Sequence, residues 1–274
     1  MPDTGRPTPG HALSVPMPLT ASLDGPPGAP VLVLGNSLGT SCAVWKRQLP
    51  ALRAHFRLLR FELPGHGGSA APAGPYTLGD LGAGVLALLD QHDIRQAGYC
   101  GISLGGMIGM WLAANHPDRI GSLGLVCTSA YLPPASGWLA RADQVQVSGL
   151  ASISTASIGR WFTPAFVNRE PAVAAAFAAE LERTDPVGYS GCCAAIAGMD
   201  LRSSLRSVTA PTIVISGAED PATPPAHGAA IASAIRGARL AVIRGAAHLA
   251  NVSSPGEVTA VLLGQPRTVS GRPR

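Results

Sequence analysis

The stretch of sequence that decides the fold is AGYCGISLGGMIGMWLAA, residues 97–114. A short apolar run ends at Cys100, a Gly-x-Ser-x-Gly pattern follows at residues 101–105, and a strongly apolar segment then continues toward Pro117. Such a segment predicts a strand, a tight turn and a buried helix, in that order. The turn places Ser103 between strand and helix, and a glycine two residues away on either side lets the backbone pass close to its neighbours.

Short apolar runs bounded by Gly or Pro recur on both sides of this segment and alternate with helical patterns. The runs occupy residues 31–34, 57–61, 97–100, 123–127, 212–216 and 240–243, and the helical patterns occupy 78–90, 107–114, 226–235 and 257–263. The alternation predicts an α/β fold, with helices on both faces of a mostly parallel central sheet. Residues 11–23, which prolines flank or interrupt, are expected to hold one or two weaker antiparallel strands.

The alternation breaks between residues 132 and 207, where the sequence is rich in alanine and has no strand-like run. We expect a helical cap or lid there, inserted into an α/β core formed by residues 12–131 and 208–264. A lid would cover the strand ends, where open α/β sheets bind ligands. The alternative is a helical excursion with no role in a site. Residues 1–11 and 265–274 are expected to be mobile tails.

The Gly-x-Ser-x-Gly pattern occurs twice, because residues 35–39 also match it around Ser37. We prefer Ser103 as the nucleophile because it has the strand–turn–helix context and strands on both sides of it in the chain. Ser37 comes too early to lie at the sheet centre. Its backbone N–H is instead expected to form an oxyanion hole with the backbone N–H of Leu104. The alternative for Ser37 is an ordinary turn residue.

A serine hydroxyl needs an imidazole base to become a nucleophile near neutral pH. Of the seven histidines, His227 and His248 lie well after Ser103, as the chain order Ser, acid, His requires. His248 follows the last strand by a short loop, whereas His227 begins a helical pattern and is expected at the surface. His66 follows a strand but precedes Ser103, and we expect it to pack behind the site.

The imidazole in turn needs a carboxylate that fixes its tautomer and stabilises its charged form. Asp220 follows the strand that ends at Ser216 and precedes His248, so it satisfies the chain order. Its neighbour Glu219 is another candidate for the catalytic acid. The alternative for Asp220 is that it only caps the helix that follows. Ser103, Asp220 and His248 are therefore the predicted catalytic residues.

Composition narrows the classes of function. The 274 residues are 46% hydrophobic and 13% charged, which is enough apolar content for one sizeable core. The formal charge of +4 comes without a basic stripe or a nucleic-acid-binding module, so no nucleic-acid partner is expected. No signal peptide and no membrane span are expected, because residues 1–10 contain three prolines and no apolar h-region and no run of about 18 apolar residues occurs. The five cysteines show no metal-binding spacing, and a reducing cytoplasm is the expected location.

These motifs resemble the α/β-hydrolase superfamily and, within it, the 3-oxoadipate enol-lactonase (β-ketoadipate enol-lactone hydrolase) family. The elbow around Ser103 is shared by many hydrolases, whereas Asn36-Ser37 and the Cys192-Cys193 pair are more specific. One departure is Pro64, where many of these lactonases have Arg. The resemblance extends over residues 12–264, and its further segments are residues 34–40 with Trp45, 65–67, 99–108, 111–114, 135–138, 160–163, 188–196, 220–224 and 247–251.

The resemblance implies hydrolysis of 3-oxoadipate enol-lactone, a small anionic lactone, to 3-oxoadipate in the degradation of aromatic compounds. It implies no metal and no organic cofactor. The substrate carboxylate needs a cationic or polar partner, for which Arg141 and Arg160 of the predicted lid are candidates, although either is also plausible as a surface residue. Trp138 is expected either to line the pocket or to pack within the lid. The sequence leaves the oligomeric state open.

Two other functions fit the same residues. A carboxylesterase or a carbon–carbon bond hydrolase of ring-cleavage products would use the same three catalytic side chains. A non-catalytic binding protein could keep the hydrolase fold, but the complete set of Ser103, Asp220 and His248 argues against it.

Overall fold

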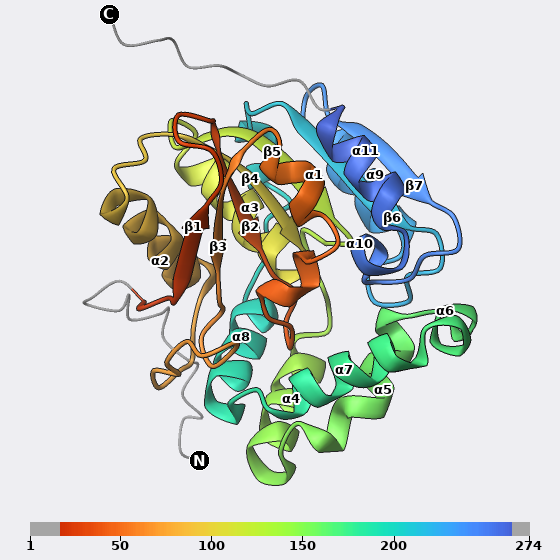
Figure 1. Cartoon of the computed structure of the whole chain (residues 1–274). Helices are drawn as coiled ribbons and strands as arrows, with labels where there is room; N and C mark the ends of the chain where they lie inside the picture. Colours follow the sequence, from red (N-terminus) through yellow and green to blue (C-terminus); the bar gives the residue numbers. More distant parts are fainter. Residues whose placement is uncertain (1–16, 265–274) are drawn as a thin grey trace, which may run out of the picture.

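The structure, a computed structural model, describes residues 17–264; the predicted tails and residues 12–16 lie outside this range. Its centre is a seven-stranded sheet in the order β1-β3-β2-β4-β5-β6-β7 (Figure 1). All neighbouring strands are parallel except β1, which pairs antiparallel with β3. The strands are β1 (Ala21–Asp24), β2 (Val31–Gly35), β3 (Arg57–Phe61), β4 (Ala97–Ile102), β5 (Ile120–Val126), β6 (Thr212–Gly217) and β7 (Arg239–Ile243). The predicted α/β fold is confirmed.

Helices cover both faces of the sheet. On α3 (Leu104–Asn115), Gly109 lies against Tyr99 and Leu123, whereas α11 (Pro255–Leu263) approaches the opposite face beside Cys100 and Gly124. Nine residues of α3 are buried, which explains why its sequence is apolar all round rather than on one stripe. The other helices of the core are η1 (Cys42–Trp45), α1 (Leu49–Arg53), α2 (Leu78–Gln91), η2 (Ser204–Ser207), α9 (Pro225–Ala234) and α10 (Ala250–Ser253).

Helix ends follow local signals. A capping box begins α2: the Thr77 side chain accepts from the backbone N–H of Asp80, and the Asp80 carboxylate accepts from the backbone N–H of Thr77. The start of α3 obeys no such signal, because its N-cap is Ser103 at φ +55° with no capping bond from its side chain. Tertiary contacts, rather than a cap, therefore fix the N-terminal end of α3. Within residues 17–264, no helix has the length and apolar character of a membrane span.

Five consecutive helices separate β5 from β6 and gather at one end of the molecule, below the sheet in Figure 1. We call them the cap. They are α4 (Ala135–Ser148), α5 (Ala151–Trp161), α6 (Pro164–Arg169), α7 (Pro171–Glu182) and α8 (Pro186–Ala197). Aromatic rings hold the cap together: Phe162 stacks on Phe166 and meets Phe177 edge-on. The division into core and cap at residues 131/132 and 207/208 stays a prediction.

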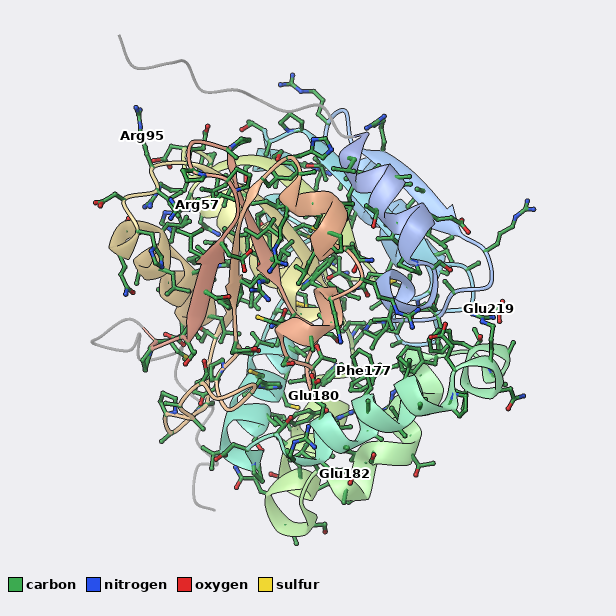
Figure 2. The ribbon with its side chains drawn as sticks, in the orientation of Figure 1. Arg57, Arg95, Phe177, Glu180, Glu182 and Glu219 are labelled. Carbon is green, nitrogen blue, oxygen red and sulfur yellow. The ribbon has the colours of Figure 1, made fainter. Side chains whose placement is uncertain are left out.

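Polar contacts fasten the cap to the loops at the carboxyl ends of the strands. The backbone N–H of Leu249 donates to the carbonyl of Trp161 at 3.0 Å, and the backbone N–H of Ser41 donates to the Glu180 carboxylate. Figure 2 shows Glu180 on the side of α7 that faces the core and Glu182 on the opposite side. The cap therefore covers the carboxyl ends of the strands, where Ser103 lies.

Candidate active site

Ser103 occupies a strained turn between β4 and α3. Its φ of +55° lies in a region that side-chain-bearing residues rarely adopt. A Cβ atom on Gly101 would lie 2.2 Å from the Gly105 carbonyl, and one on Gly105 would lie 2.4 Å from the Gly35 backbone. Both glycines of the Gly-x-Ser-x-Gly pattern are thus required by close backbone contacts.

The Ser103 hydroxyl has no hydrogen-bond partner among the residues that the structure describes, and the residue is 8% exposed. The main-chain carbonyl of Ser103, by contrast, accepts a 2.7 Å bond from Thr128 Oγ1. The turn is therefore held from behind while its side chain stays free to react.

Asp220 is the buried carboxylate of the candidate site. The residue is 3% exposed and accepts from the backbone N–H groups of Ala222 (2.8 Å) and Thr223 (3.0 Å) and from the Thr223 hydroxyl (2.7 Å). Glu219, its competitor in the sequence, is exposed and labelled at the rim of the molecule in Figure 2. Three hydrogen bonds donated to the Asp220 oxygens favour the ionised form of this side chain.

Asp220 and His248 form a buried pair. His248 Nδ1 lies 2.8 Å from Asp220 Oδ2, and His248 is 4% exposed. Burial opposes ionisation of Asp220, but the His248 charge and the hydrogen bonds from His248 and Thr223 outweigh it and lower the carboxyl pKa to about 2. Asp220 is therefore a carboxylate at any working pH and can orient an Nδ1–H imidazole.

Parallel strands of one sheet bring Ser103 and His248 to the same end of the sheet, at the carboxyl ends of the strands. Ser103 follows β4, and the loop before His248 lies against the end of β6, where a Cβ on Gly217 would be 2.3 Å from the Ala247 carbonyl. Within residues 17–264 no hydrogen bond joins the Ser103 hydroxyl to the His248 imidazole. Catalytic hydrogen bonds often tighten only when substrate binds. The lack of a Ser103–His248 hydrogen bond in this structure is therefore compatible with the two residues acting as a catalytic pair.

The backbone N–H groups of Ser37 and Leu104, the predicted oxyanion-hole donors, have no acceptor among the described residues. Ser37 is 1% and Leu104 is 0% exposed, and neither N–H donates to another described residue. The Gly105 N–H donates to the Asn36 carbonyl at 2.9 Å, which ties the loop after β2 to the first turn of α3. Free, buried N–H groups that start a helix or lie against it are suited to hold an oxyanion.

His66 takes part in this arrangement in a way that the sequence did not reveal. Its Nδ1 lies 2.8 Å from the Pro64 carbonyl, and its Nε2 accepts the Gly39 N–H at 2.9 Å. The ring is 1% exposed, and burial lowers its pKa to about 4, so the imidazole is neutral with Nδ1 protonated. His66 therefore supports the loop that carries Ser37.

The depressed pKa of His66 predicts a pH-dependent stability. An unfolded histidine titrates near 6.5, so between pH 6.5 and about 4 the unfolded chain binds a proton that the folded chain excludes. We expect this residue's contribution, complete above pH 6.5, to fall by about 3 kcal/mol as pH drops to about 4. Urea unfolding of the wild type and of His66→Gln at several pH values measures it as the difference between the two curves. Parallel curves would contradict the prediction.

Two arginines of the cap meet without an acidic partner. Arg141 Nε donates to the Tyr189 hydroxyl at 2.8 Å, and its Nη2 donates to Ser157 Oγ at 2.9 Å, to which Arg160 Nη2 also points at 3.4 Å. Burial, and then repulsion from Arg141, lowers the pKa of Arg160. Trp138 borders this cluster, with the Arg141 guanidinium 5.9 Å from its ring centre and its own Nε1 bonded to the Leu132 carbonyl. Uncompensated, partly buried positive charge favours an anionic ligand.

The other histidine that the sequence analysis considered, His227, has no hydrogen bond to Asp220 among the described residues. Its Nδ1 is 2.7 Å from Ser129 Oγ, and the side chain is only half-buried. That hydroxyl donates to the Tyr131 carbonyl at 2.7 Å. His227 therefore anchors a loop and has no place in the candidate site.

Comparison with known proteins places this geometry in a family. The family described as "alpha/beta hydrolase fold" matches residues 30–255. 3-Oxoadipate enol-lactonase 2 of Acinetobacter baylyi is 38% identical over 82% of this chain and 84% of its own length. The crystal structure of an enol-lactonase from Burkholderia xenovorans LB400 shares 40% identity at a TM-score of 0.87, covering 89% of this chain and 95% of that one. A hydrolase from Pseudomonas aeruginosa PA01 shares 43% identity at the same TM-score, covering 89% and 92%. The chain belongs to the α/β-hydrolase family.

Proposed function

We propose that this protein hydrolyses 3-oxoadipate enol-lactone to 3-oxoadipate, with Ser103 as nucleophile, His248 as general base and Asp220 as the acid that orients the base. The buried hydrogen bond between Asp220 and His248, at the sheet edge that carries the Ser103 turn, is the observation that supports it most directly. The two Acinetobacter baylyi relatives that carry the enol-lactonase name, 38% and 35% identical to this chain, support the choice of substrate.

In the proposed mechanism His248 removes the Ser103 proton as the oxygen attacks the lactone carbonyl. The N–H groups of Ser37 and Leu104 hold the oxyanion that develops, and losing one such donor typically costs about 10²–10³-fold in rate. The ring C–O bond then breaks, and the departing enolate takes the proton from His248 and becomes the ketone, which leaves His248 neutral again. His248 next activates a water molecule, which releases the acyl group from Ser103. The residues of the chain supply every step of this sequence.

Arg141 and Arg160 are proposed to bind the carboxylate of the substrate. They carry positive charge that no carboxylate among residues 17–264 neutralises, so an anion would relieve the repulsion between them. Trp138 would form part of the wall beside them. Pro64, where many enol-lactonases are expected to have Arg, lies against α8: a Cβ on Gly188 would be 2.3 Å from the Pro64 carbonyl. The cap is then the source of the cations that a lactone with a carboxylate arm requires.

A comparison of substrates tests the proposal. The purified protein is assayed on the enol-lactone, with 3-oxoadipate detected as product, and on uncharged short-chain p-nitrophenyl esters. We expect kcat/KM to be about 10–100-fold higher on the lactone, since a hydrogen-bonded ion pair with the carboxylate contributes about 1.5–3 kcal/mol. A preference for the esters would favour the carboxylesterase alternative. Turnover of a vinylogous 1,5-diketone ring-cleavage product in place of either would favour the carbon–carbon bond hydrolase.

Removing the charge of Arg141 should separate substrate binding from chemistry. In Arg141→Met we expect KM for the enol-lactone to rise by about 10–100-fold, with kcat/KM for the uncharged esters changed by less than about threefold. Arg169→Met is the matched control, since Arg169 lies exposed on α6 of the same cap with its guanidinium over Phe166. Equal losses on charged and uncharged substrates would show that Arg141 supports the cap rather than the carboxylate.

A cytoplasmic location stays a prediction. It agrees with the five cysteines, all of which are free thiols in the structure. We expect no nucleic-acid or membrane partner.

A further inference from the structure

The loop that carries Ser37 depends on one buried side chain for its shape. The loop crosses from β2 to η1, and Gly39 within it has φ +82°. Both the Thr40 N–H (3.1 Å) and the Thr40 hydroxyl (2.9 Å) donate to the Ser37 carbonyl. The Gly39 N–H donates to a different acceptor, His66 Nε2, at 2.9 Å. A single imidazole thus receives the N–H of the residue at the tip of this turn.

His66 itself has little freedom to move. Its Nδ1–H is bonded to the Pro64 carbonyl at 2.8 Å, two residues back along its own loop. The Tyr189 ring stacks on the imidazole at 6.2 Å between centroids, with 21° between the planes. Tyr189 is itself fixed, because its hydroxyl accepts from Arg141 Nε. Both ring nitrogens are used and one face of the ring is covered, so the imidazole presents Nε2 in one direction only.

A buried histidine with two neutral hydrogen bonds has no proton to exchange with substrate. The role of His66 is structural. Its rigid ring links two loops, because Nδ1–H donates to the Pro64 carbonyl and Nε2 accepts from the Gly39 N–H. We propose that His66 is a positioning residue that holds the Ser37 N–H in place for the oxyanion. The proposal rests on the proposed function, since it assigns the loop to the oxyanion hole.

Replacing His66 by Asn or by Gln tests the hydrogen bonds of its two ring nitrogens separately. Asn can reproduce the Nδ1 donor to the Pro64 carbonyl but does not reach Gly39, whereas Gln can place an acceptor oxygen where Nε2 lies. We therefore expect His66→Asn to lower kcat by about 10–100-fold with KM changed by less than about threefold, because one oxyanion donor becomes misplaced rather than lost. His66→Gln should recover most of kcat. His92→Asn, at the C-cap of α2 next to the amino end of the sheet, is the matched control.

Three readouts distinguish positioning from a loss of stability. Kinetics are measured on the enol-lactone and on an uncharged p-nitrophenyl ester, because a misplaced oxyanion donor lowers kcat on both. Affinity for phenylboronic acid, which forms a tetrahedral adduct with a serine oxygen, should weaken in His66→Asn in proportion to kcat. Thermal unfolding shows whether each variant is folded at the assay temperature. Equal kcat in the Asn and Gln variants, or a rise in KM alone, would overturn the proposal.

Hydrogen exchange keeps the proposal testable if the proposed activity fails. The Gly39 amide is followed by NMR in the wild type and in both variants, without any substrate. We expect its exchange to be at least about tenfold faster in His66→Asn than in His66→Gln, since only the latter retains an acceptor for this N–H. Slow exchange in both variants would show that His66 does not hold the loop. Absence of Ser103-dependent turnover in the wild type would instead contradict the proposed function alone.

Discussion

Replacing Ser103 by alanine is expected to lower kcat on the enol-lactone by at least about 10⁵-fold, because the nucleophile of a serine hydrolase acts as a unit with its base and losing it costs nearly the whole covalent route. The residual rate would come from the oxyanion donors and from binding alone. Steady-state kinetics measure the loss, and a fluorophosphonate probe checks the site: the wild type should be labelled and Ser103→Ala should not.

The second Gly-x-Ser-x-Gly match supplies a demanding comparison. Ser37→Ala removes a hydroxyl but keeps the backbone N–H that the mechanism uses, so its activity should fall by no more than about tenfold. Fluorophosphonate labelling that survives Ser103→Ala but not Ser37→Ala would move the nucleophile to the loop after β2. Labelling that survives both changes would leave the proposed covalent chemistry without a serine, and retained turnover in Ser103→Ala would reject it.

Most strands were predictable because they are short apolar runs flanked by glycine or proline, and β2, β3, β6 and β7 begin and end within one residue of the predicted ranges. The start of α3 was less predictable. Gly105 and Gly106 disfavour a helix, so the helical pattern was expected to begin at residue 107, whereas α3 begins at Leu104. Close contact with Gly35 and Thr128 requires glycine at these positions, and tertiary packing outweighs local propensity there.

The candidate site was predictable in part. Chain order and position after a strand indicated Asp220 and His248, but Glu219 is next to Asp220 in the sequence, and the sequence offers no measure of which of the two is buried. The structure distinguishes the two carboxylates by the donors that Thr223 and its neighbour supply. The role of His66 was not predictable, because its partner Gly39 lies 27 residues away and the contact depends on how two loops meet.

The structure also predicts a large difference between replacing Asp220 and replacing its neighbour Glu219. Asp220 offers two oxygens to four donors: His248 Nδ1, the Thr223 hydroxyl and the N–H groups of Ala222 and Thr223. In Asp220→Asn one oxygen becomes an NH₂ group, which must face either the two backbone N–H groups or the imidazole. The first arrangement opposes donor to donor; the second makes Nδ1 an acceptor and moves the imidazole proton to Nε2, where a base is needed.

We therefore expect Asp220→Asn to lower kcat by about 10⁴-fold, the size of loss that follows when a catalytic imidazole is held in the wrong tautomer. Because the Asp220 pKa lies near 2, the wild-type carboxylate is ionised throughout the assay range, so the loss reflects the missing carboxylate and not its protonation. Glu219→Gln is the matched control: it removes a carboxylate one residue away that is exposed to solvent, and kcat should stay within about twofold of the wild type. If Glu219→Gln proved the more damaging change, the acid would have to be reassigned, and the buried pair with His248 would be structural. If Asp220→Asn kept a tenth of the activity or more, His248 would have to be a base that needs no carboxylate to orient it.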